Sequence, residues 1–350
     1  MKKPRGLKYR EIQLDLNLYR TRVPVPTLSD VSLSVLDVWP DGAEQTLMLV
    51  HGYAGCAETW EYQINHFSHQ YRVVVPDLRG HGQSDAPFTE YTMPELVADI
   101  DAIANALNLP EKFVLVGHSF GGSICAEYAA AHPERLEKLI LIATAGEYPL
   151  PRSAALLSRV PVAIFQPLWK YRPRWNAEVH VMKRMMLNNL RKWKGWDVLA
   201  KISTPALVIT GERDRYFPRW AFERVRDAVP GAEVLDVGAS KHKVQVERHQ
   251  AVNRAIERFI QQSEQARRIS WRDQGEMSQL MSDRPWLRSY GKFTPFTCPI
   301  PRQPLPRFLE TAAEQVPNQI ATVFYGSKLS YRQLDRRVNQ FAHALHGLGV

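Results

Sequence analysis

Short apolar runs alternate with longer amphipathic stretches along the first 262 residues. Six runs are almost continuously apolar, which is typical of strands buried on both faces of a mostly parallel sheet. They are TLMLVHG (46–52), YRVVVPD (71–77), KFVLVGH (112–118), LEKLILIA (136–143), PALVITG (205–211) and AEVLDVG (232–238). The stretches between them, such as 93–107, have helical spacing. The alternation predicts an open α/β fold, and two earlier runs, 8–16 and 31–39, are expected to be antiparallel edge strands.

The alternation is interrupted once, between residues 147 and 200. No strand-like core run occurs there, and tryptophan, arginine, lysine and proline accumulate. We predict a helical cap inserted into the α/β domain. Residues 177–196 place their apolar side chains on one face of a helix. These side chains are Val179, Met182, Met186, Leu190 and Trp193.

The pattern changes after residue 262. Residues 263–283 are polar and predict a linker. Residues 284–350 begin with a proline-rich stretch and end in a predicted helix, in which Ser330 and Gln333 have the spacing of a capping box. The apolar positions of this helix recur on one face, which must pack on something.

Composition narrows the class of protein. Hydrophobic residues make up 45% of the 350, which is ordinary for a globular chain, and no apolar run approaches the ~20 residues of a membrane span. The three cysteines show neither a disulfide framework nor a metal-binding spacing. The first residues lack the apolar core of a signal peptide. We expect a cytoplasmic protein without a metal.

The net charge of +9 is concentrated in one segment. Residues 147–201 contain eleven Lys or Arg and three Asp or Glu, so the rest of the chain is nearly neutral. A nucleic-acid partner is therefore not expected. Two interpretations remain open: the cap contacts an anionic surface or head group, or it is a lid whose basic face is merely solvated.

The segment VGHSFGGS (116–123) carries the strongest chemical signal. A buried strand runs directly into G-x-S-x-G, and a helix follows, which is the context of a nucleophilic serine on a sharp turn. Side chains at positions 117 and 121 would clash with the neighbouring strand and helix. The helix N-terminus behind Ser119 favours developing negative charge. Ser119 is the predicted nucleophile.

A serine nucleophile needs a base and an orienting acid. In this architecture the acid follows the serine in the chain, and the histidine follows the acid. Asp214 ends the loop after the run 205–211, and His242 lies in the loop after 232–238, so both reach the carboxyl edge of the sheet. We predict Asp214 as the acid and His242 as the base. The less favoured alternatives are Glu147, Glu212 and Asp236 as acids and His249 as base.

An oxyanion hole needs two backbone N–H groups directed at the developing charge. Phe120 follows the nucleophile and should supply one. Tyr53, in the loop HGYAG (51–55), is the candidate for the other. The remaining histidines of these loops are expected to bond loop backbone rather than to transfer protons. They are His51, His81 and His118.

Residues 8–262 resemble the α/β-hydrolase superfamily, in the branch with short HG-x-x-G oxyanion loops. The resemblance rests on HGYAG (51–55), DLRGHGQSD (77–85), GHSFGG (117–122), GERD (211–214) and KHKVQVERHQAVNRAI (241–256), in the order of that family. It implies an α/β-hydrolase fold with the same triad and oxyanion donors. The family often has glycine before the histidine, where this chain has Lys241. Its dehalogenases and epoxide hydrolases use an aspartate nucleophile, so Ser119 argues against both activities.

Residues 284–350 resemble the first segment of an adenylate-forming acyl-CoA ligase. The resemblance rests on RPWLRSY (284–290) and on the run 304–350, with its S-Y-x-x-L helix. The phosphate loop, adenine motif and catalytic lysine of that family are absent, so no adenylation is expected. Either this segment is the truncated N-terminal part of a ligase domain, with the apolar face of its final helix exposed, or the tail packs on another partner.

These features predict a serine hydrolase, without a cofactor, that acts on a small-molecule acyl ester or thioester. Two alternatives use the same triad, namely C–C bond hydrolysis and cofactor-free perhydrolysis. A third is a non-catalytic interaction module that kept the fold. The fused ligase-like segment makes acyl chains the expected substrate group.

Overall fold

The computed structural model describes residues 14–149, 160–169, 176–214, 216–261, 305–324 and 327–348. The chain divides into two compact units, Met1–Glu264 and Gln265–Val350. The first unit contains the sheet and all the candidate catalytic residues. The second contains two helices and a pair of strands within its described residues.

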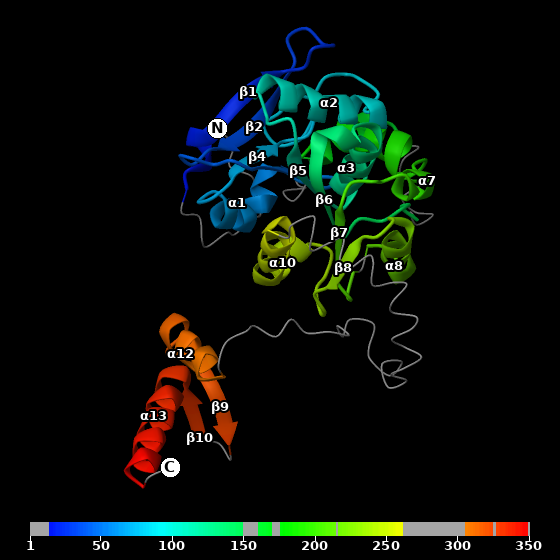
Figure 1. Ribbon diagram of the computed structural model, residues 1–350. Helices are drawn as coiled ribbons and strands as arrows, with labels where there is room; N and C mark the ends of the chain where they lie inside the picture. The colour runs from blue at the N-terminus through cyan, green and yellow to red at the C-terminus, as the bar shows by residue number, and fades with distance from the viewer. Residues whose placement is uncertain are drawn as a thin grey trace. The chain divides into compact units, whose positions relative to one another are not determined.

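An eight-stranded sheet forms the centre of the first unit, in the order β1-β2-β4-β3-β5-β6-β7-β8 (Figure 1). The strands are β1 (Arg20–Pro24), β2 (Ser32–Val38), β3 (Thr46–Val50), β4 (Arg72–Pro76), β5 (Phe113–His118), β6 (Leu136–Ile142), β7 (Ala206–Thr210) and β8 (Glu233–Asp236). Strands β3 to β8 pair in parallel, while β1 and β2 are antiparallel. Every residue of β3, β4 and β5 is buried, which explains their continuous apolar runs.

The first predicted edge strand, residues 8–16, lies mostly outside the described residues, and its described part, 14–16, is not in a strand. Residues 8–13 lie outside the described residues, and Leu16–Tyr19 form a 3₁₀ turn, η1, in which the Asp15 side chain accepts the Asn17 N–H. The edge strand is β1 instead. Its sequence RTRVP has a single buried residue, Val23, because an edge strand faces solvent on most sides, so it gives no apolar run. The strand expected within 31–39 is confirmed as β2.

Helices cover both faces of the sheet (Figure 1). One face carries α1 (Glu61–Phe67) and α10 (His249–Gln261), which contact each other. The other carries α2 (Met93–Ala106), α3 (Phe120–Ala131), α7 (Trp196–Ala200) and α8 (Arg219–Ala228), each in contact with the next. The short helices η2 (Ala57–Trp60), η3 (Pro133–Arg135) and α9 (Val244–Glu247) complete the unit. The predicted α/β fold is confirmed.

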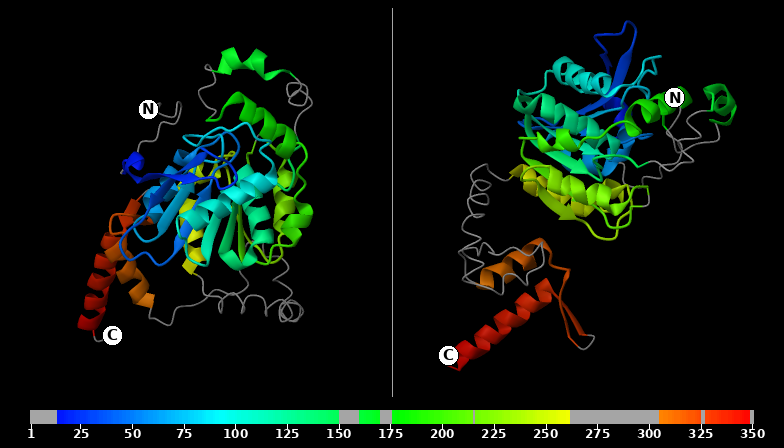
Figure 2. Two further views of the ribbon diagram at one scale, coloured as in Figure 1. Left: turned by 90° about the horizontal axis from the view of Figure 1, so that it is seen from above. Right: turned by 90° about the vertical axis from the view of Figure 1, so that its right-hand side faces the viewer.

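The cap contains α5 (Val162–Trp169), α6 (Val179–Met185) and a π-helical turn, η4 (Met186–Leu190) (Figure 2). The predicted helix 177–196 is therefore shorter and ends after Leu190, in a turn where the N–H of Lys192 bonds to the carbonyl oxygen of Asn189. Its apolar face is buried at Val179, Met182 and Leu190. Amphipathic spacing found the buried face but not the end of the helix.

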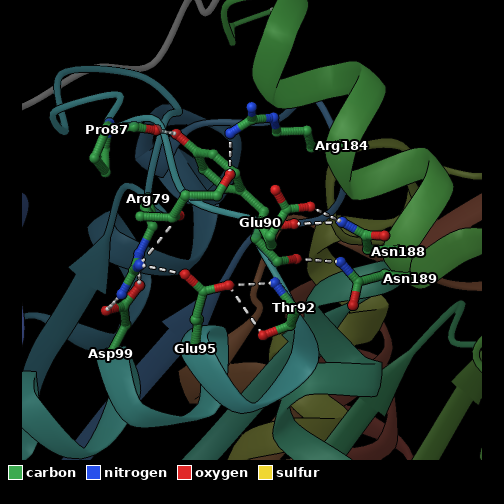
Figure 3. A network of polar contacts seen from close by, with 11 residues as sticks. Arg79, Pro87, Glu90, Thr92, Glu95, Asp99, Arg184, Asn188 and Asn189 are labelled. Atoms are coloured by element: carbon green, nitrogen blue, oxygen red, sulfur yellow. Dashed lines mark hydrogen bonds and ion pairs between the residues drawn. The ribbon is translucent and has the colours of Figure 1, made fainter.

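A polar network ties the cap to the segment before α2 (Figure 3). Arg184 donates to the Thr89 carbonyl oxygen, and Asn188 Nδ2 donates to the Glu90 carbonyl oxygen at 2.7 Å. Asn189 Nδ2 donates to the Tyr91 carbonyl oxygen. These side chains hold backbone groups that no helix or strand satisfies. The cap is therefore anchored to the α/β domain beside the carboxyl edge of the sheet.

Some of the cap's cationic and aromatic side chains are engaged within the protein. Lys183 Nζ donates to the Val160 carbonyl oxygen at 2.9 Å, and the indole N–H of Trp193 donates to a Glu127 carboxylate oxygen at 2.7 Å. The side chains of Trp169 and Trp175 are not among those that the structure describes. These contacts favour the interpretation of the cap as a lid over contact with an anionic surface, which stays a prediction.

The second unit contains α12 (Leu305–Gln315), the antiparallel strands β9 (Ile320–Phe324) and β10 (Ser327–Ser330), and α13 (Tyr331–Gly347). The capping box of Ser330 and Gln333 is confirmed, as both of its hydrogen bonds are present. Val338 and Phe341, on the apolar face of α13, are 43% and 66% exposed. The expectation that this face lacks a partner stays a prediction. Among all the described residues, no helix is both long enough and apolar enough to cross a bilayer.

Candidate active site

The turn between β5 and α3 holds Ser119 in a strained backbone conformation. Its φ of 53° lies in the left-handed region that favours glycine. A Cβ on Gly117 would lie 2.5 Å from Gly122 Cα in α3, and a Cβ on Gly121 would lie 2.3 Å from the His51 carbonyl oxygen. Both distances are far below a normal contact, so the predicted clashes at these positions are confirmed. The two glycines allow β5, α3 and the loop after β3 to meet around Ser119.

Two hydrogen bonds join Ser119, His242 and Asp214. His242 Nε2 lies 2.8 Å from Ser119 Oγ, and His242 Nδ1 lies 2.5 Å from Asp214 Oδ2. The three residues follow β5, β8 and β7 respectively, so all of them leave the carboxyl edge of the sheet. The structure thus brings together the serine, base and acid that the sequence analysis selected, with the imidazole between the hydroxyl and the carboxylate.

Asp214 is held in its charged form by its neighbours. Its Oδ1 accepts the backbone N–H groups of Tyr216 and Phe217 at 2.8 and 3.3 Å. Burial acts to raise the pKa of Asp214, but the hydrogen bond and charge of His242 and these two donors outweigh it and hold the pKa below its usual range. The ionised carboxylate accepts the Nδ1–H of His242, which leaves Nε2 to accept the Ser119 proton.

The alternative acids and base lie elsewhere in the unit. His249 stacks on Tyr62 with ring centroids 4.1 Å apart, and Asp236 Oδ1 accepts the N–H of Gly238 at 2.7 Å. None of the four alternatives lines the cavity that contains Ser119. They are Glu147, Glu212, Asp236 and His249.

The loop between β3 and η2 packs directly against the nucleophile. A Cβ on Gly52 would lie 3.0 Å from Ser119 Cβ. The next residue, Tyr53, donates its hydroxyl to the Met182 carbonyl oxygen at 2.8 Å, which links this loop to the cap. Tyr53 and Phe120 both line the cavity beside Ser119. The two predicted oxyanion donors therefore belong to residues that line the same cavity as the nucleophile.

Three buried histidines support these loops. His51 Nε2 accepts a backbone N–H, His81 Nε2 accepts the N–H of Ala54, and His118 Nε2 lies 2.9 Å from the carbonyl oxygen of His242. Burial lowers the pKa of His51 and His118 to about 3 and that of His81 to about 4. The neutral His118 ring donates to the backbone of His242 and so helps to position it. The expected role of these histidines in bonding loop backbone is confirmed.

Acid should destabilise the α/β unit through these three histidines. In the unfolded chain each takes up a proton near its ordinary pKa of ~6.5, whereas in the folded protein each stays neutral down to about pH 3 to 4. As the pH falls below ~6.5 the unfolded chain binds more protons, so the free energy of unfolding decreases by up to about 1.4 kcal/mol per histidine and pH unit. We expect a clearly lower urea midpoint at about pH 5.5 than at about pH 7.5. Equal midpoints would contradict the neutral state of these rings.

Ser119 lies in a cavity of about 600 Å³ with two chemically different walls. The wall nearest the cap is apolar and is formed by Tyr148, Met182, Met186, Leu190 and Phe217. The wall near η2 and α9 is polar and is formed by Thr59, Lys241, Lys243, Gln245 and Glu247. Sequence patterns did not identify Phe217 or Gln245 as site residues; the available signal was their nearness in the chain to Asp214 and His242. Within the described ranges, no three His, Cys, Asp or Glu side chains form a group able to hold a metal ion.

Two protein-family models match the part of the chain that forms most of the sheet and carries the triad. A family model described as "alpha/beta hydrolase fold" matches residues 45–180, and a second model, described as "TAP-like protein", matches residues 185–270. The two matches together cover the sheet from β3 onward, the cap and all three triad residues. Both end before residue 284, so they do not bear on the ligase-like segment.

Individual relatives cover parts of the chain. Protein ABHD8 from Homo sapiens is 26% identical over 246 residues, 62% of this chain and 55% of that protein. Epoxide hydrolase 4 from Homo sapiens is 38% identical over 130 residues, 35% of this chain and 36% of that protein. The chain thus spans about half the length of the first of these relatives and less of the second. The solved enol-lactonase from Burkholderia xenovorans LB400 is similar in fold, with a TM-score of 0.59 and 22% identity over 68% of this chain and 100% of that one.

Proposed function

We propose that this chain, a member of the α/β-hydrolase superfamily, is a serine hydrolase that cleaves a carboxylic ester or thioester. The observation that carries the proposal is the hydrogen-bonded series Ser119–His242–Asp214 at the wall of a partly apolar cavity. A base 2.8 Å from a hydroxyl, itself oriented by a carboxylate, is the arrangement that nucleophilic acyl transfer requires.

The proposed reaction has two stages. Ser119 Oγ attacks the carbonyl carbon while its proton passes to His242 Nε2, and the resulting imidazolium is stabilised by Asp214. The tetrahedral intermediate then expels the alcohol or thiol, which takes the proton from His242. A water molecule, deprotonated by His242, attacks the acyl-enzyme, and the acid product leaves Ser119 with its hydroxyl restored.

The oxyanion of each tetrahedral intermediate is proposed to accept hydrogen bonds from the N–H groups of Tyr53 and Phe120. Both residues line the cavity that contains Ser119, and Gly52, next to Tyr53, packs against Ser119, which supports this assignment. Phe120 is the first residue of α3, so the partial positive charge of the helix N-terminus adds to the effect. The apolar wall under the cap is proposed to receive the acyl chain.

Other reactions of the same triad remain alternatives. C–C bond hydrolysis and cofactor-free perhydrolysis also begin at a serine held by histidine and aspartate. Epoxide opening, suggested by the name of one relative, is less favoured because the epoxide hydrolases of this superfamily use an aspartate where this chain has Ser119. The hydrogen bond that the Ser119 hydroxyl donates to His242 Nε2 favours acyl transfer.

For the remaining features we keep the sequence-based proposals. Residues 284–350 are proposed to correspond to the opening segment of an acyl-CoA ligase, without the motifs for adenylation. The strands β9 and β10 and the capped helix α13 are compatible with this resemblance. The cytoplasmic location proposed from the cysteine content can be tested by fractionating cells.

A chain-length series tests the proposed reaction. We expect hydrolysis of p-nitrophenyl esters or acyl-CoA thioesters, with the rate rising with acyl length until the apolar wall is filled and falling beyond it. The series that is hydrolysed with the higher kcat/KM shows whether the enzyme is an esterase or a thioesterase. If the folded protein cleaves neither series, simple acyl hydrolysis is the wrong reaction, and the C–C and perhydrolysis alternatives come first.

A further inference from the structure

The polar wall of the cavity places two cations next to the catalytic base. Lys241 and Lys243 flank His242, and both line the cavity. In the described part of the chain, no hydrogen bond or ion pair is found for either ammonium group. Glu247 is the acidic residue of this wall, and its Oε2 already accepts the Lys241 backbone N–H at 2.8 Å. The wall therefore presents excess positive charge to whatever lies beside His242.

A buried amide belongs to the same wall of the cavity. Gln245 is 1% exposed and lines the cavity, and neither its Nε2 nor its Oε1 has a hydrogen-bond partner among the described residues. A buried amide without partners costs about 1–3 kcal/mol. Because solvent reaches neither of its polar atoms, a ligand could bond to them only after the Gln245 side chain turns toward the cavity.

The chemistry of the triad determines which part of a substrate meets this wall. His242 must protonate the leaving oxygen or sulfur, so the leaving group passes beside His242. Lys241 and Lys243 therefore face the leaving group, whereas the acyl chain lies against the apolar wall of Met182, Met186 and its neighbours.

We propose that the substrate is an acyl ester or thioester whose leaving group carries an anionic group, a carboxylate or a phosphate, bound by Lys241 and Lys243. The anion pairs with the two ammonium groups at the mouth of the cavity, where they are exposed. Part of the attraction is screened by water and salt, so the preference should weaken as ionic strength rises. This inference rests on the proposed acyl hydrolysis and adds the class of its leaving group.

Matched esters test the charge preference. 4-Carboxyphenyl butyrate and 4-carbamoylphenyl butyrate differ mainly in the charge of the leaving group. We expect about tenfold higher kcat/KM for the carboxylate, and a ratio near one in the double variant Lys241→Gln/Lys243→Gln. Lys112→Gln is the matched control: Lys112 is exposed just before β5, at the opposite edge of the sheet, and its removal should leave the ratio unchanged.

Two further experiments distinguish failure of the proposed anion site from failure of the proposed acyl hydrolysis. Phenyl hemisuccinate carries its carboxylate on the acyl side, and phenyl butyrate is its uncharged counterpart. A higher kcat/KM for the charged ester in this pair alone would overturn the placement of the anion on the leaving group. The affinities of Ser119→Ala for 4-carboxyphenyl butyrate and 4-carbamoylphenyl butyrate, measured by calorimetry, do not depend on turnover. Equal affinities there, or equal kcat/KM in the wild type, would overturn the inference while leaving acyl hydrolysis intact. Selective binding of the carboxylate without turnover would support the anion site and contradict the proposed reaction.

Discussion

Replacement of Ser119 by alanine is expected to lower kcat for ester hydrolysis by about 10⁴-fold or more. The variant removes the Oγ that lies 2.8 Å from His242 Nε2 and leaves no hydroxyl there to attack the carbonyl carbon. The oxyanion donors and the cavity remain, so binding of the substrate should change little. The measurement is steady-state hydrolysis of the best p-nitrophenyl ester or acyl-CoA, with the circular dichroism spectrum to check folding.

Ser203→Ala is the matched control. Ser203 is exposed in the loop before β7, at the edge of the sheet away from the triad, and its replacement should leave kcat unchanged. A Ser119→Ala variant that is folded and retains more than about a tenth of the wild-type kcat would rule out Ser119 as the nucleophile.

Asp214→Asn is expected to lower kcat by about 10³- to 10⁴-fold, with little change in KM. The neutral amide no longer stabilises the imidazolium that forms when His242 takes the serine proton. Its NH₂ group also favours the wrong tautomer of the ring, with the proton on Nε2, which then cannot accept from Ser119. The separate values of kcat and KM show whether the loss is in the chemical step.

Glu212→Gln provides the comparison for this variant. Glu212 lies two residues earlier in the same loop, is exposed, and was an alternative acid on sequence grounds. It should retain nearly wild-type kcat, because the 2.5 Å contact to His242 Nδ1 comes from Asp214. Equal losses in the two variants would show that the loop, rather than the carboxylate of Asp214, determines the activity.

The sheet and the three triad positions were accessible from the sequence for a physical reason. Strands buried on both faces need apolar residues at every position, so β3, β4 and β5 stand out as continuous runs. The run at 232–238 was expected to be buried in the same way, but β8 lies at the sheet edge and none of its residues is fully buried. Parallel strands deliver their following loops to one edge, so Ser119, Asp214 and His242 were expected together before any contact was known. Strand β1 was missed because an edge strand with one buried residue has no such run.

The walls of the cavity were not accessible in this way. Tyr148, Met186, Phe217 and Gln245 come from four separate segments, and only folding brings them to one cavity. The ring of Tyr148 lies 5.1 Å from that of Phe217, a contact across about 70 residues of sequence that no local pattern encodes. Substrate preference depends on such contacts, which is why the leaving-group inference required the structure.

Covalent labelling with a fluorophosphonate tests the central claim most directly, because the reagent phosphonylates a serine that a nearby histidine activates. The account predicts one adduct per wild-type chain, located by peptide mass spectrometry on Ser119, and no adduct on folded Ser119→Ala. Folded wild-type protein that takes up no label, or an adduct that persists in Ser119→Ala, would contradict Ser119 as the nucleophile of this enzyme.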